Sequence, residues 1–126
     1  MRLLLDTNAL LWWEEGSERL GARTRSAILA CDAVYVSAAS AWEAEIKRAL
    51  GKLAFAGDVD EMIRANDFIE LPVEVRHATA LRSLESHHRD PFDRVLVAQA
   101  KLEECTLVTA DMNLAQYGVD VLDARL

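Results

Sequence analysis

Short apolar segments alternate with longer segments of helical periodicity along the whole chain of 126 residues, and this alternation constrains the fold most. Segments rich in Leu or β-branched residues predict strands at Arg2–Leu5, Val34–Ser37, Phe68–Leu71, Thr106–Thr109 and Val119–Leu122. The segments between them predict helices at Ala9–Glu14, Ala22–Cys31, Ala39–Leu50, Val59–Asn66, Val73–Leu84 and Pro91–Glu104. Such an order indicates an α/β fold with a mostly parallel sheet covered by helices on both faces.

Signals at the ends of two predicted helices support this reading. Ser37 and Ser40 can cap the helix that follows them, and Gly51 can end it. The segment Asp90–Asp93 offers a capping residue followed by proline at the first helical position. The chain has no linker rich in Gly, Ser or Pro and no internal repeat, so residues 1–126 are expected to form a single domain.

The composition favours a folded, soluble, cytoplasmic protein. Apolar residues make up 52% of the chain, enough for a core, and the longest apolar runs are far shorter than the roughly 18 residues that a membrane span needs. Strand-like residues begin at Arg2, so the N-terminus is expected to belong to the fold. Cys31 and Cys105 lie among apolar or small neighbours, as free thiols in a reducing compartment do. The net charge of −7 argues against binding of nucleic acid through a broad basic surface, although it leaves a local site open.

Four acidic residues occupy positions that a parallel sheet would bring together. Asp6 and Asp111 each follow a predicted strand, and Glu43 lies one turn into the helix after another strand. Asp93 opens the helix that leads into the strand before Asp111. Ligands of open α/β sheets bind beyond the carboxyl ends of the strands, so these acids are candidates for one site.

Taken singly, each acid has a structural explanation. Asp6 or Asp111 could be a turn or capping residue, Asp93 could complement a helix dipole, and Glu43 could pair with Lys47 on a solvated helix face. Together they would repel one another unless a cation held them ionised. Hard oxygen ligands without a His or Cys cluster favour Mg²⁺ or Mn²⁺ over Zn²⁺. Metal-dependent hydrolysis of a phosphodiester is therefore the leading reaction.

Sequence blocks around these acids resemble the PIN-domain nucleases and, within them, the VapC-type toxins of toxin–antitoxin pairs. The blocks are Leu3–Asn8, Ser40–Glu43 with Lys47 and Gly51–Leu53, His88–Arg94 running into Ala98–Ala100, and Leu107–Asp111. The resemblance implies a three-layer α/β/α sandwich, a ribonuclease that depends on Mg²⁺ or Mn²⁺, homodimerisation and inhibition by a cognate antitoxin protein.

The resemblance also assigns roles residue by residue. Its catalytic and metal-binding acids match Asp6, Glu43, Asp93 and Asp111. Asn8 and Thr109 match polar residues that orient those acids. Asp90 is also acidic and close in sequence, and we interpret it as the cap of the helix that carries Asp93.

Contacts to RNA and to partner proteins are predicted from charge and apolar pattern. Lys47, Lys52 and Arg89 are candidates for contacts with the RNA backbone. Trp12 and Trp13 are adjacent on a helix, so their side chains diverge and one could contact a partner. We expect an apolar surface there, or along the helices of residues 59–84, that packs against a second copy or an antitoxin helix.

Other functions remain open at this point. An aspartyl-phosphate phosphatase would need a second acid at the position of Asn8, and a receiver domain would need a lysine after a late strand, whereas the last lysine is Lys101 within a predicted helix. A non-catalytic module that binds RNA or a partner would not need four acids. A PIN-like nuclease that cleaves DNA, or that processes RNA outside a toxin system, is the main alternative.

Overall fold

The computed structural model describes residues 1–85 and 90–126, so the predicted substrate contact Arg89 lies outside the described residues. The strands are β1 (Arg2–Leu5), β2 (Ala33–Ser37), β3 (Ile69–Leu71), β4 (Thr106–Thr109) and β5 (Val121–Asp123). The helices are α1 (Thr7–Glu15), α2 (Ala22–Ala30), α3 (Ala38–Ala49), α4 (Val59–Ala65), α5 (Val75–Ala80) and α6 (Pro91–Leu102), with 3₁₀ helices η1 (Leu81–Ser83) and η2 (Met112–Tyr117).

The five strands form one sheet in the order β3-β2-β1-β4-β5, and each neighbouring pair is parallel. Strand β1 lies in the centre, where Leu4 is in register with Tyr35 of β2 and Leu107 of β4. Because all the strands run in one direction, their carboxyl ends meet at the same edge of the sheet. The acids that follow β1 and β4 therefore start from adjacent positions at that edge.

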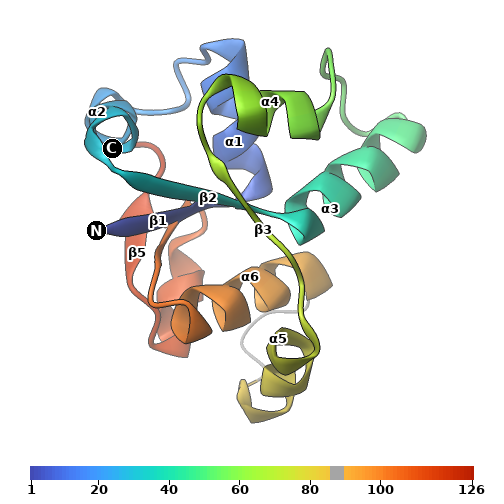
Figure 1. The fold of residues 1–126 in the computed structure, drawn as a ribbon, viewed down its shortest axis with the longest axis vertical. Coiled ribbons are helices and arrows are strands. Elements are labelled where there is room, and N and C mark those ends of the chain that lie inside the picture. Colours follow the sequence, from blue (N-terminus) through green and yellow to red (C-terminus); the bar gives the residue numbers. More distant parts are fainter. Residues whose placement is uncertain (86–89) are drawn as a thin grey trace.

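Burial on both faces of β1 divides the core into two parts. Leu3 and Leu5 belong to a cluster with residues of α1, α2 and α4, whereas Leu4 belongs to a cluster with residues of α6 and η2. All three leucines are fully buried. Figure 1 shows α1, α2 and α4 on one side of the sheet and α5 and α6 on the other. The predicted three-layer α/β/α fold with a parallel sheet is confirmed.

Besides shifts of one or two residues at the ends of other elements, two segments differ from the sequence-based prediction. The helix expected over Val73–Leu84 is the short α5 followed by η1. It begins at Val75 because Glu74 is its cap residue, and the Glu74 N–H donates to Nδ1 of His77 at 2.9 Å. The helix η2 was not predicted, because its six residues are too few for a helical period to stand out.

In the described part of the chain, no helix is both long enough and apolar enough to cross a membrane. Both cysteines are unpaired: Cys105 is buried and Cys31 is partly exposed.

Candidate active and metal site

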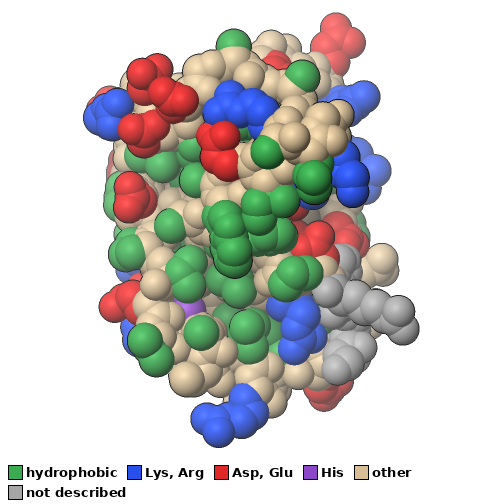
Figure 2. Space-filling model, turned by 90° about the vertical axis from the view of Figure 1, so that its right-hand side faces the viewer, with side chains coloured by type: hydrophobic (Ala, Val, Ile, Leu, Met, Phe, Trp, Pro, Cys, Tyr) green, Lys and Arg blue, Asp and Glu red, His purple; other side chains and the backbone are tan. Residues whose placement is uncertain are grey.

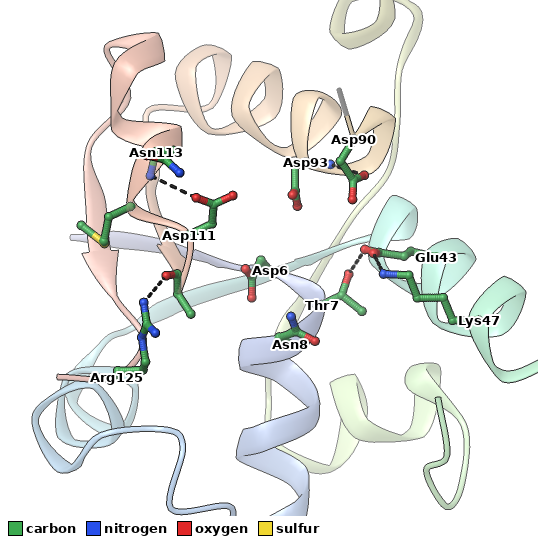
Figure 3. A pocket seen from close by; sticks show the side chains of 12 residues that line it. Asp6, Thr7, Asn8, Glu43, Lys47, Asp90, Asp93, Asp111, Asn113 and Arg125 are labelled. Carbon is green, nitrogen blue, oxygen red and sulfur yellow. Dashed lines mark hydrogen bonds and ion pairs between the residues drawn. The ribbon is translucent and has the colours of Figure 1, made fainter. Parts of the chain in front are cut away.

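A polar pocket of about 590 Å³ lies at the carboxyl edge of the sheet, above β1 and β4 (Figure 3). Its described lining residues come from the segments that follow β1 and β4, including the starts of α1 and η2, from α3, from the start of α6 and from the C-terminal segment: Asp6, Thr7, Asn8, Glu43, Lys47, Asp90, Asp93, Ala110, Asp111, Met112, Asn113 and Arg125. The four acids predicted from four separate elements thus line one cavity.

Asp6 is buried and sits at the junction of β1 and α1. Its carboxylate accepts a hydrogen bond from the Ala9 N–H at 2.8 Å and so caps α1. Burial raises the pKa of Asp6 to about 6, against the lowering effects of the Ala9 N–H and the Thr109 hydroxyl. The negative charges of Glu43 and Asp111 raise this pKa further. Asp6 therefore experiences the repulsion expected of converging carboxylates.

Glu43 lies in the second turn of α3, and two side chains fix its carboxylate. The Thr7 hydroxyl donates to Oε1 at 2.5 Å, and Lys47 Nζ donates to Oε2 at 2.5 Å. The pairing with Lys47 at i+4 was the structural explanation for Glu43, but Glu43 is only 5% exposed and does not lie on a solvated face. Sequence analysis did not identify Thr7, because its partner lies 36 residues away.

Asp90 and Asp93 lie together at the N-terminus of α6 but have different contacts. Asp90 Oδ1 accepts hydrogen bonds from the N–H groups of Phe92 and Asp93 at 2.9 and 3.3 Å, which is the capping role predicted for it. Pro91 occupies the first turn of the helix. Asp93 lies in the first turn of α6 and projects toward Asp6 in Figure 3. Both acids line the pocket, so Asp90 adds negative charge to the site even as it caps the helix.

Asp111 is positioned by the end of β4. Its own N–H donates to the Thr109 hydroxyl at 3.0 Å, and its carboxylate accepts from the Asn113 N–H at 3.1 Å to cap η2. Thr109 is fully buried and its hydroxyl also lowers the pKa of Asp6, so this side chain connects two of the acids. This is the kind of contact expected of a residue that orients acids.

The remaining predicted residues fall into different places. Asn8 is exposed and lines the pocket. Lys47 lines it as well, and its bond to Glu43 raises the pKa of the ammonium group above the usual range. Lys52 lies in the turn after α3 and is not among the described lining residues. Arg125 lines the pocket although sequence analysis did not identify it.

The donor set fits a hard divalent cation. The acids Asp6, Glu43, Asp93 and Asp111 offer carboxylate oxygens, the ligands that Mg²⁺ and Mn²⁺ prefer. The electrostatic strain on Asp6, whose pKa is raised to about 6, is of the kind that a bound cation would relieve.

A second group of ionisable residues lies away from the pocket, and its contacts have a structural role. Among the described residues, the ligand atoms of Glu74, His77 and Glu103 lie within 4.8 Å of one another. His77 is fully buried, with Nδ1 accepting from the Glu74 N–H and Nε2 2.9 Å from Glu103 Oε2. Arg76 also forms ion pairs with both glutamates. Nδ1 thus caps the start of α5, and Nε2 ties α5 to the end of α6.

The fold and the pocket place this protein among α/β/α sandwich proteins that have an acidic site at the carboxyl edge of a parallel sheet. Within this class, residues 3–120 match the PIN domain family model. The chain therefore belongs to the PIN domain family, as the motif blocks led us to expect. No curated protein matches the chain.

Solved structures of similar fold include components of toxin–antitoxin complexes. A chain of a toxin–antitoxin complex from Klebsiella pneumoniae matches with 17% identity and a TM-score of 0.65, over 97% of each chain. A chain of VapBC2 from Rickettsia felis, bound to a promoter DNA fragment, matches with 12% identity and a TM-score of 0.66, over 98% of each chain. A chain of FitAcB from Neisseria gonorrhoeae matches with 20% identity and a TM-score of 0.65, over 97% of each chain. These likenesses support the fold.

Proposed function

We propose that residues 1–126 form a single nuclease domain that hydrolyses RNA internally with Mg²⁺ or Mn²⁺. The observation that carries this proposal is the meeting of Asp6, Glu43, Asp93 and Asp111, from four separate elements, in one pocket at the carboxyl edge of the sheet. Membership of the PIN domain family supports nuclease chemistry. The choice of RNA rests on the resemblance to VapC-type toxins, and DNA cleavage is the alternative that the experiment must separate.

In this proposal the acids hold the cation and the neighbouring side chains hold the acids. A bound Mg²⁺ or Mn²⁺ would polarise the scissile phosphodiester and lower the pKa of a water molecule. Asp6, Asp93, Asp111 and Glu43 would be its ligands. Thr7 and Lys47 fix the Glu43 carboxylate from two sides, and the Thr109 hydroxyl fixes Asp111 through its N–H. Asn8, which also lines the pocket, is proposed to help orient these acids.

We further propose that the protein acts in the cytoplasm as the toxin of a toxin–antitoxin pair. The support is the fold likeness to chains of toxin–antitoxin complexes. The charge balance also suits a basic partner segment. The four site acids account for four of the seven excess negative charges, so −7 + 4 = −3 remains outside the site. That remainder would attract a basic antitoxin segment at low ionic strength.

Cleavage of matched RNA and DNA tests the proposed activity. The protein is incubated with a panel of labelled single-stranded RNAs and with DNAs of the same sequences, in Mg²⁺, in Mn²⁺ or with EDTA. We expect fragments from RNA in either metal and none with EDTA, because the acids without a cation repel the phosphate. The product of a small neighbouring gene is expected to suppress this cleavage. Cleavage of DNA alone, or cleavage that survives EDTA, would contradict the proposal.

The surface around Trp42 is proposed to pack against a second copy of the chain. This Trp42 patch consists of the lining residues of an apolar groove between α3 and α6: Ala38, Ala39, Trp42, Val73, Pro91, Phe92 and Val95. Trp42 is 65% exposed and packs edge to face on Phe92, with ring centroids 5.2 Å apart. Figure 2 shows hydrophobic side chains gathered across the middle of one face of the molecule. Trp12 and Trp13, one of which was predicted to contact a partner, are both partly buried and pack against the core.

Trp42→Ser is expected to weaken self-association by about 30-fold or more, the effect of removing an interface residue worth about 2 kcal/mol. Sedimentation equilibrium over a range of concentrations measures this effect. Leu29→Ser is the control, since Leu29 is 72% exposed on α2 and does not line the groove. A wild-type protein that stays monomeric at every concentration would refute the assignment.

A further inference from the structure

The C-terminal segment places a positively charged side chain, Arg125, at the rim of the acidic pocket. Among the described residues that line the pocket, Lys47 and Arg125 carry a positive charge. Figure 3 shows them on opposite sides of Asp6: Lys47 beside Glu43, and Arg125 on the side of Asp111. Lys47 Nζ is bonded to Glu43, so its charge is directed at a site acid.

The backbone that carries Arg125 is fixed from two directions. The Ala124 N–H donates to the Thr109 carbonyl at 2.9 Å, which continues the contact between β4 and β5. On the other side, the Gly21 N–H donates to the Ala124 carbonyl at 2.9 Å, and the Thr24 hydroxyl donates to the Asp123 carbonyl at 2.7 Å. These bonds hold the segment between the sheet and the start of α2.

Gly21 permits this close packing. A Cβ atom at position 21 would lie 2.0 Å from the backbone carbon of Leu126 and 2.5 Å from the carbonyl oxygen of Arg125. Such distances are far below van der Waals contact, so only glycine allows the two backbones to approach this closely. Arg125 is therefore held at a defined position beside the pocket.

The guanidinium group of Arg125 keeps donors available to a ligand. Nη2 donates to the Ala110 carbonyl at 2.6 Å, and Nε lies 3.7 Å from Asp123 Oδ1. The side chain is nevertheless 61% exposed. A guanidinium group has five N–H donors in a planar fork that matches the oxygens of a phosphate. The Ala110 contact thus aims the group at the pocket without using most of its donors.

A nucleic-acid strand that enters this pocket presents more than one phosphate. A metal ion held by the acids would neutralise the charge of the scissile phosphate. The neighbouring phosphates would lie close to the carboxylates that line the pocket and would be repelled by them. We propose that Arg125 binds a backbone phosphate next to the scissile one, on the Asp111 side of the site. This proposal rests on the proposed nuclease function and adds that the strand crosses the pocket from the Arg125 side toward the Lys47 side.

The salt dependence of binding tests the contact. The affinity for a fluorescein-labelled single-stranded RNA of mixed sequence is measured by anisotropy at several KCl concentrations, with Ca²⁺ replacing Mg²⁺ to limit cleavage. For Arg125→Gln we expect a slope of log K against log salt that is shallower by about 0.7, the value for one lost phosphate contact on a single strand. Affinity should fall by a similar factor for every sequence. Arg125→Lys should keep the wild-type slope.

Arg64→Gln is the matched control, because it removes the same charge from α4 at a position that does not line the pocket. If Arg125→Gln and Arg64→Gln have the same slope, the proposal is overturned. A structural role through Ala110 would instead reduce the rise in melting temperature on Mg²⁺ addition and leave the slope unchanged, and this result would also overturn it.

The outcomes separate this proposal from the nuclease function. If the wild type binds RNA with the slope change in Arg125→Gln but cleaves nothing in Mg²⁺, the phosphate contact stands and the nuclease function fails. If the wild type cleaves RNA and Arg125→Gln behaves like Arg64→Gln, the contact fails and the function stands. A wild type that neither binds nor cleaves RNA contradicts both.

Discussion

Asp6→Asn is expected to lower metal-dependent RNA cleavage by about 10³-fold or more, because the loss of one charged ligand removes several kcal/mol of transition-state stabilisation. The fold should survive the change. Asparagine is as good a helix cap as aspartate, so its side-chain oxygen can still accept the hydrogen bond from the Ala9 N–H. The substitution therefore separates the chemistry of Asp6 from its role in α1.

Initial rates of cleavage and circular dichroism spectra, measured on the same samples, check this result. Asp58→Asn is a suitable control, because Asp58 also occupies the cap position of a helix, α4, but does not line the pocket. We expect the wild-type rate for Asp58→Asn. Equal rates for Asp6→Asn and the wild type would show that the reaction occurs elsewhere.

The contribution of Asp6 to the stability of the metal-free protein is expected to fall as the pH rises from 4 to 7. The pKa of Asp6 is raised to about 6 in the folded protein, from an ordinary value of 3.8. The folded state therefore binds more protons than the unfolded state between these values, and this contribution to stability is lost as the pH rises through about 6. A shift of this size corresponds to about 3 kcal/mol in the free energy of unfolding.

Urea unfolding in EDTA at several pH values, for the wild type and Asp6→Asn, isolates this effect. Asparagine does not titrate, so the free-energy difference between the two proteins contains the Asp6 contribution. We expect similar stabilities near pH 4 and a more stable Asp6→Asn protein at pH 7. Mg²⁺ at pH 7 should stabilise the wild type more than the variant. A difference that does not change with pH would contradict the raised pKa.

Local patterns were sufficient to predict most of the fold. The leucines of β1 are buried on both faces, which is why they appear as a continuous apolar run in the sequence. The segment Asp90–Asp93 predicted the start of α6, because its capping bonds and its proline are all local. The acids of the candidate site could be predicted for the same reason, since each lies at or near the end of a predicted strand or the start of a predicted helix.

Other features depend on contacts that no local pattern contains. Thr7 reaches Glu43 across 36 residues, and Arg125 lies at the pocket because Gly21 lets two distant backbones meet. The exposed groove beside Trp42 depends on how α3 packs against α6. Sequence analysis predicted the acids that line the pocket, whereas tertiary packing determined that Thr7 and Arg125 lie beside them.

The acids Asp6, Asp90 and Asp111 each begin a helix as well as line the pocket. For Asp6 and Asp111, which are also proposed metal ligands, this double use would make the proposed catalysis easier to lose in evolution than the fold. A single exchange of aspartate for asparagine or serine at such a position would keep the helix start and remove a negative charge. Lineages of this fold that have abandoned cleavage and kept only a binding role are therefore expected to carry asparagine or serine at these positions.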